Sequence, residues 1–369
     1  MCARLTFPTK LMKAQSTLIA LAAAVVVPAA PAAPRSATFD VRHELKVVVP
    51  DDARQLRVWF TMPQDDPQQQ VMQFKVDSPF PHRITTDSAG NTAVYLELAE
   101  PKMKEFSVVE TFTLARREQV SGVEADKARP LAVGKREEFR SFLSTNQHVI
   151  IDDRIRKLAL DVVGDEKNPV RAAHKLYDWM LANIDYWVKD PKNKKASPVG
   201  STEYCLTAKT GNCTDFHSLW TSLARAAGIP TRMVYGSFFK KELDGQDADQ
   251  SYHCWPEFYA TGFGWVPHDV AVADIFVGDF QSNADNEKLV RLTTADGYRG
   301  ADKAKVDYYF GNLDERRVTW SRGRDLTLSP KQTGGPVNAL AKAYVEVDGK
   351  PAVEKEVWTR KLTFRELKQ

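Results

Sequence analysis

The sequence predicts an α+β fold in which a β-sandwich precedes helices that pack on an antiparallel sheet. From about Thr38 to Gln119, apolar residues alternate with polar ones, a period of two that is typical of strands. From about Val133 to Asn183, apolar residues recur at spacings of three and four, which is typical of helices. Strand-like runs return after Pro230. Helices followed by antiparallel strands favour an α+β arrangement.

The first 37 residues differ from the rest and predict a signal peptide. The basic residues Arg4, Lys10 and Lys13 precede an apolar run from Leu18 to Val27, and Ala30-Pro31-Ala32 offers small residues for cleavage. The apolar run is shorter than the roughly 20 residues of a membrane span. We therefore expect an exported protein, periplasmic or secreted, without a membrane span.

The charge of the chain excludes one class of partner. Its net charge of +3 arises from 51 basic and 48 acidic residues, and the first 32 residues, up to the predicted cleavage site, hold three of the basic ones. The mature chain is therefore neutral, which gives no electrostatic basis for binding nucleic acid. The lysines between Lys189 and Lys195 lie in a loop with proline and asparagine and are interpreted as solvated.

Residues 38–125 are predicted to form the β-sandwich. Runs such as Leu56, Val58 and Phe60 alternate with polar residues, and turn signals such as Gly90-Asn91 separate them. Such a sandwich is a common scaffold without chemistry of its own. Residues 281–369 are expected to form a small C-terminal extension, partly β, with a hairpin at Ala343–Val347.

Residues 133–280 are predicted to form the catalytic core. One helical stripe includes Ile155 and Val162, and Asn168-Pro169 begins a second helix. A third helix runs from Cys213 to Ala227 and ends before Gly228. The Cys213 thiol thus lies at the positive end of a helix, where unpaired N–H groups and the helix dipole favour the thiolate.

Two later strands supply partners for this thiol. Alternation places His253, Trp255 and Glu257 on one face of the strand 252–259 and Cys254 on the other, so Cys254 is expected to lie outside the site. A hairpin at Thr261-Gly262 would bring Asp269 beside His253 and hold the imidazole in one tautomer.

The motifs Gly211–His217, Leu223–Arg232, His253–Glu257 and Gly264–Asp269 resemble the core of the transglutaminase-like superfamily, in its bacterial exported branch. The similarity covers about residues 170–275. It implies a papain-like core with Cys213 as nucleophile, His253 as general base and acid, and Asp269 as the orienting carboxylate. The implied reaction is acyl transfer on protein or peptide amides, and we expect no cofactor and no metal.

The resemblance also bears on the fate of the acyl group. Eukaryotic relatives have a tryptophan directly after the nucleophile, whereas this chain has Thr214, and no calcium site is identified. Both departures favour hydrolysis over protein crosslinking. Crosslinking, or a weakly active binding or assembly module, remains the alternative. The Cys213 N–H is expected to bind the oxyanion, but the sequence does not place a second donor.

Five other residues near the predicted site are candidates for supporting roles. Asn212, Thr214, His217, Trp255 and Glu257 are possible supporting residues. His217 follows Cys213 by one helical turn and competes with His253 as a base. Trp255 is interpreted first as packing, and the role of Glu257 stays open.

The three cysteines of the mature chain raise two further alternatives. An odd number leaves at least one thiol unpaired, and a Cys205–Cys254 disulfide with Cys213 free is one possibility. A zinc site is disfavoured because the spacings lack the short paired-ligand pattern. If Cys213 is the nucleophile, its sulfur must be held apart from that of Cys205. The sequence does not indicate the oligomeric state.

Overall fold

A computed structural model describes Met1 and residues 33–278, 280, 286–293 and 298–368. The predicted signal peptide lies almost entirely outside the described residues. All helices and strands belong to one unit that begins at Pro34. None of the described helices is long and apolar enough to cross a membrane.

Two antiparallel sheets pack face to face as the predicted sandwich. The first has the order β17 (Trp358–Leu367), β1 (Ser36–Val48), β6 (Glu105–Arg117) and β3 (Gln69–Asp77). The second has the order β16 (Lys350–Pro351), β15 (Ala343–Val347), β2 (Gln55–Thr61), β5 (Thr92–Ala99) and β4 (Arg83–Thr86). Their inner faces share one buried apolar cluster, which includes Leu45, Phe60 and Val345.

The C-terminal residues complete this sandwich. β17 pairs with β1 along ten residues, and β15 pairs with β2. The expectation of a separate C-terminal extension therefore misses a long-range pairing, because strand order in a sheet cannot be read from the period of apolar residues. The expected hairpin at Ala343–Val347 is present as β15 and β16.

The core consists of helices that cover a second antiparallel sheet. Its strand order is β12 (Gly264–Pro267), β11 (Tyr252–Ala260), β10 (Thr231–Phe238) and β14 (Arg317–Arg322). The helices are α1 (Asp153–Val163), α2 (Pro169–Asn183), α3 (Thr202–Ala208), α4 (Cys213–Ala226), α5 (Val270–Ile275), α6 (Glu287–Thr293) and α7 (Lys303–Tyr308). Two short pairs are β8 (Asp185–Tyr186) with β9 (Thr210–Gly211), and β13 (Asn312–Leu313) with β7 (Gln119–Val120). The chain thus has the predicted α+β fold.

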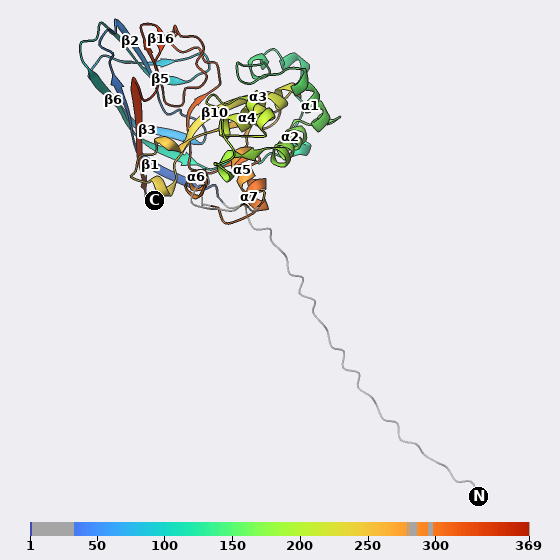
Figure 1. Ribbon diagram of the computed structural model, residues 1–369. Helices are drawn as coiled ribbons and strands as arrows, with labels where there is room; N and C mark the ends of the chain where they lie inside the picture. The colour runs from blue at the N-terminus through green and yellow to red at the C-terminus, as the bar shows by residue number, and fades with distance from the viewer. Residues whose placement is uncertain (2–32, 279, 281–285, 294–297, 369) are drawn as a thin grey trace. The chain divides into compact units, whose positions relative to one another are not determined.

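Helix α4 is the centre of the core. Every residue from Cys213 to Arg225 is buried, because α1, α2, α3 and α5 surround it and β10 and β11 lie against it. Figure 1 shows α1 to α4 grouped together, with β10 between them and the strands of the sandwich. A helix buried on all sides is held rigidly, which fixes the position of its first residue.

The sandwich holds the outer strand of the core sheet in place. The Gln69 side chain accepts a hydrogen bond from the Thr319 N–H (2.8 Å) and donates one to the Thr319 carbonyl (3.0 Å). Arg116 of β6, almost fully buried, donates to the carbonyl of Arg317. The sandwich therefore positions β14, which reaches the predicted catalytic residues.

Candidate active site

The start of α4 is fixed by side chains on both sides of Cys213. Asn212 accepts hydrogen bonds from the N–H groups of Thr214 (2.9 Å) and Asp215 (3.1 Å), and Asp215 accepts one from Asn212 N–H (2.9 Å). This is a reciprocal capping box. A Cβ at Gly211 would lie 2.3 Å from that of Asp215, so only glycine fits before the cap. These contacts leave the first N–H of the helix, that of Cys213, without a partner among the described residues.

His253 and Asp269 meet as the sequence predicts. β11 and β12 form the expected hairpin, with Glu257 opposite Pro267. β12 ends at Pro267, and Asp269 then caps α5 by accepting a hydrogen bond from Val272 N–H (3.0 Å). The other oxygen of Asp269 lies 2.7 Å from His253 Nε2. The second imidazole nitrogen, Nδ1, is thereby free to serve the thiol of Cys213, whose charge acts on His253.

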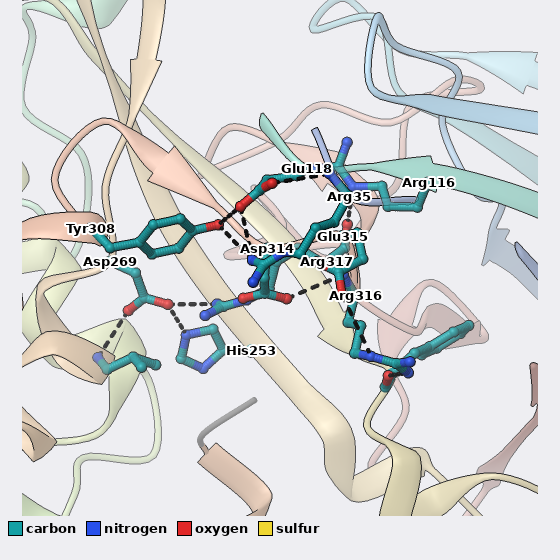
Figure 2. A network of polar contacts seen from close by, with 12 residues as sticks. Arg35, Arg116, Glu118, His253, Asp269, Tyr308, Asp314, Glu315, Arg316 and Arg317 are labelled. Atoms are coloured by element: carbon teal, nitrogen blue, oxygen red, sulfur yellow. Dashed lines mark hydrogen bonds and ion pairs between the residues drawn. The ribbon is translucent and has the colours of Figure 1, made fainter. Parts of the chain in front are cut away.

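Arg317 is a part of this site that the sequence analysis missed. Its guanidinium is fully buried, and Figure 2 shows it joining Asp269 to Asp314 beside His253. Nη1 lies 2.5 Å from Asp269 Oδ2, and Nε lies 2.9 Å from Asp314 Oδ2. The motif Arg316-Arg317 was visible in the sequence, but only the pairing of β14 with β10 brings it to the site.

The charges of the site favour a thiolate beside an imidazolium. A hydrogen bond from Cys254 and the charge of His253 hold the pKa of Cys213 well below its usual value, although burial opposes this. Burial also opposes the charge of His253, but Asp269 and Cys213 outweigh it and raise its pKa to about 9. His253 and Arg317 keep the pKa of Asp269 well below its usual value against the effect of burial.

Tyr186 adds a hydroxyl group next to the thiol. Its strand β8 pairs in parallel with β9, which places Tyr186 opposite Gly211, and its ring packs edge-on against Phe216. The Cys213 sulfur is near enough to act on this hydroxyl. Burial, and then the negative charge of Cys213, raise the pKa of Tyr186 well above its usual value, so that it remains a donor. No pattern in the sequence indicates this proximity.

The expectation that Cys254 lies outside the site is wrong. Its sulfur lies 3.5 Å from Thr214 Oγ1 and 3.6 Å from His217 Nδ1, and Thr214 Oγ1 in turn lies 3.9 Å from the Cys213 sulfur. The alternation rule failed because β11 begins at Tyr252. His253 and Cys254 lie at the end of the strand, where residues of both faces reach the start of α4. All three cysteines are free, so the possible Cys205–Cys254 disulfide is absent among the described residues.

The other possible supporting residues have different surroundings. The hydroxyl groups of Thr214 and Tyr252 share a hydrogen bond of 2.9 Å. Glu257 accepts a hydrogen bond from Arg232 at 2.6 Å, an ion pair within the sheet. Trp255 is buried and contacts the backbone of β10 at Gly236. Trp255 and Glu257 therefore stabilise the sheet and do not contact the thiol.

A groove of about 520 Å³ leads to the residues that flank Cys213. Asn212, Thr214, Tyr235 and Tyr252 line it on the core side, and the segment 334–344 lines the opposite side. This segment is fastened to the core by Arg324, which donates to Asn338 and to the carbonyls of residues 199 and 200. The volume is within the range of small-molecule and peptide sites.

Comparison with other proteins agrees with this geometry. Residues 156–270, which include Cys213, His253 and Asp269, match the sequence model of the transglutaminase-like superfamily. This part of the chain belongs to that superfamily. The transglutaminase-like core is therefore the domain that holds the thiol, the imidazole and the carboxylate.

Relatives are similar to the chain beyond this core. An uncharacterized protein of Haemophilus influenzae is 26% identical over 339 residues, which cover 85% of this chain and 86% of the relative. YebA of Bacillus subtilis, also uncharacterized, is 26% identical over 152 residues, 38% of this chain and 21% of that protein. The crystal structure of a candidate cysteine protease from Cytophaga hutchinsonii has a TM-score of 0.56 at 16% identity and covers 91% of this chain and 92% of its own. At this identity the likeness shows a shared fold, and it extends over the sandwich as well as the core.

Proposed function

We propose that the protein is an exported cysteine-dependent hydrolase that cleaves amide bonds of proteins or peptides by acyl transfer through Cys213, His253 and Asp269. The observation that carries this proposal is the closed set of contacts at the start of α4. The charges of Cys213 and His253 act on each other, and His253 Nε2 lies 2.7 Å from Asp269. Nucleophile, base and orienter in hydrogen-bond reach are what thiol acyl transfer requires.

The first chemical step uses the thiolate and the imidazolium together. Sulfur attacks the amide carbonyl carbon, and the S–C bond forms as the carbonyl oxygen takes up negative charge. His253 then gives its proton from Nδ1 to the departing amine, and the C–N bond breaks to leave a thioester. Asp269 keeps Nε2 protonated and so holds Nδ1 toward the sulfur.

The negative oxygen formed in this step needs donors that are already in place. The Cys213 N–H at the first position of α4 is one such donor. The Tyr186 hydroxyl, which is near the Cys213 sulfur, is the second donor in this proposal. Both are fixed by buried elements, so little reorganisation accompanies the reaction.

Water completes the cycle in the proposed hydrolysis. His253, now neutral, accepts a proton from water, and the resulting hydroxide attacks the thioester and releases Cys213. Thr214 and Asn212 border the groove beside the thioester, and both are polar residues that accommodate water. The same groove, bordered on its opposite side by the segment 334–344, would hold the substrate.

Export is supported by the sequence of basic residues, apolar run and small residues at the start of the chain. The proposal expects a mature protein that lacks residues 1–32 and is recovered from the periplasm or the medium. Mass spectrometry of the protein from fractionated cells tests this, and a full-length cytosolic protein would contradict it.

A panel of amide substrates tests the proposed reaction. New amino termini, released ammonia and incorporated amine are measured for the wild type, Cys213→Ala and Cys205→Ala. We expect new amino termini with the wild type and Cys205→Ala but not with Cys213→Ala. Incorporated amine in place of new termini would establish crosslinking. No product and no burst with any substrate would support a binding module.

A further inference from the structure

A second thiol and a second imidazole use the same carboxylate as the catalytic pair. Cys254 Sγ lies 3.6 Å from His217 Nδ1, and His217 Nε2 lies 3.4 Å from Asp269 Oδ1. His253 uses the other oxygen of Asp269. All four side chains and Asp269 are almost fully buried. Two pairs of thiol and imidazole, Cys213 with His253 and Cys254 with His217, therefore share the Asp269 carboxylate.

The tautomer of His217 follows from its position. A bare nitrogen lone pair 3.4 Å from a carboxylate oxygen would be repelled, so Nε2 carries the hydrogen, although this contact is not an aligned hydrogen bond. In neutral His217 the lone pair is then on Nδ1, and Nδ1 faces the Cys254 sulfur. His217 is thus placed to accept a proton from Cys254 as His253 does from Cys213.

The two sulfurs are neighbours, and they differ in access. Both lie close to the same atom, Thr214 Oγ1, at 3.5 Å for Cys254 and 3.9 Å for Cys213. Cys213 is 4% exposed and borders the groove residues, whereas Cys254 is 0% exposed. A small oxidant from solvent therefore meets Cys213 before Cys254.

We infer that Cys254 and His217 form a resolving pair, which converts peroxide-oxidised Cys213 into a reversible Cys213–Cys254 disulfide. The inference rests on the proposed function, because it requires Cys213 to be a thiolate. It assigns His217 a role that is separate from amide hydrolysis. The oxidant is a hydroperoxide, and the reductant that restores activity is a dithiol.

Both steps balance with groups of the site. The Cys213 thiolate attacks one peroxide oxygen, the O–O bond breaks, and the departing alkoxide or hydroxide takes the proton of His253, leaving a sulfenic acid. Cys254 then gives its proton to His217 Nδ1 and attacks the Cys213 sulfur. The S–S bond forms, the S–O bond breaks, and the hydroxide leaves as water with the proton from His217. In sum, two thiols and one hydroperoxide give a disulfide, an alcohol or water, and one further water.

The charges at the site determine which of the two thiols reacts first. Burial and the neighbouring Cys213 thiolate raise the pKa of Cys254 well above its usual value, so Cys254 stays protonated in the reduced enzyme. Oxidation of Cys213 to a neutral sulfenic acid removes that neighbouring charge. Cys254 then becomes easier to ionise only after Cys213 has been oxidised, which avoids two adjacent thiolates.

The test treats the reduced mature protein with stoichiometric hydrogen peroxide. We expect complete loss of activity, a disulfide-linked peptide pair containing Cys213 and Cys254, and full recovery with dithiothreitol. In an excess of peroxide, which supplies the second oxidation, Cys254→Ser should instead accumulate sulfinic acid at Cys213 and recover little activity. Cys205→Ser, which changes a buried cysteine of α3, should behave as the wild type. His217→Gln should form the disulfide at least tenfold more slowly than the wild type. Its rate of Cys213 oxidation should equal that of the wild type.

The outcomes separate this inference from the proposed function. Iodoacetamide labelling of reduced protein at neutral pH reports the Cys213 thiolate independently of peroxide. Rapid labelling with no disulfide, or equal over-oxidation of the wild type and Cys254→Ser, would overturn the resolving pair and leave the hydrolase intact. A disulfide between Cys213 and Cys205 would also overturn it. Slow labelling of Cys213 would overturn both. Circular dichroism confirms that each variant is folded.

Discussion

Replacing Arg317 by methionine tests how the buried charges hold the site together. Methionine has a similar length but no charge, so Asp269 and Asp314 lose their shared guanidinium. Asp269 keeps His253 and the Val272 N–H. Arg316→Met is the matched control, because Arg316 is also buried and ion-paired, with Glu366, but does not contact Asp269.

The expected effects differ in kind between the two variants. Removing one partner of a fully buried ion pair costs about 3–5 kcal/mol of unfolding free energy. The partner of Arg316 is partly exposed, so Arg316→Met should cost about 1–3 kcal/mol. In Arg317→Met no guanidinium offsets the negative charge of Asp269, so this charge favours protonated His253 more strongly. The pKa of His253 should therefore rise above its value of about 9.

Two assays measure these effects. Urea unfolding followed by near-ultraviolet circular dichroism gives the loss of stability. The alkaline limb of kcat/KM reports the pKa of His253 in the free enzyme. It should move to higher pH in Arg317→Met and stay in place in Arg316→Met. If both variants shift the limb equally, or Arg317→Met lowers it, the reasoning is refuted. If Arg317→Met does not fold, Arg317→Gln, which keeps hydrogen-bond donors at this position but carries no charge, replaces it.

Three further predictions concern the same elements. Tyr186→Phe keeps the packing on Phe216 but removes the hydroxyl, so kcat should fall about 10²- to 10³-fold, as for other oxyanion donors; an unchanged kcat, measured with a folded variant, would exclude this role. Asn212→Ala removes the cap of α4 and should cost about 0.5–2 kcal/mol in urea unfolding, whereas a neutral change would contradict the capping box. The raised pKa of His253 should contribute about 3 kcal/mol of stability that is fully present below about pH 6.5. This contribution is lost as pH rises through about 9, so the wild type should lose more stability over this range than His253→Ala.

The sequence was sufficient for the parts of the site that local patterns determine. Gly211, Asn212 and the following apolar spacing place Cys213 at a helix start, and the structure has α4 beginning there. The hairpin of β11 and β12 follows from two strand patterns and a short turn, and it brings Asp269 to His253. The helices α1 and α2 likewise follow from their apolar period.

The remaining parts depend on pairings between distant segments. Arg317 reaches Asp269 only because β14 pairs with β10, and the C-terminal strand β17 joins the sandwich only because it pairs with β1. No local period contains that information. Cys254 shows a different failure, because alternation assigns a face but does not say where a neighbouring helix begins. At the end of a strand both faces can contribute to one site.

The pH dependence of Cys213 alkylation tests the thiolate–imidazolium pair most directly. Iodoacetamide is used with the reduced protein between pH 5 and 10, and the modified residue is identified by mass spectrometry. We expect rapid labelling of Cys213 at pH values well below the ordinary thiol pKa of about 8.5. This low-pH reactivity should be lost in His253→Ala. A rate that rises only near pH 8.5 and is the same in His253→Ala would contradict this expectation.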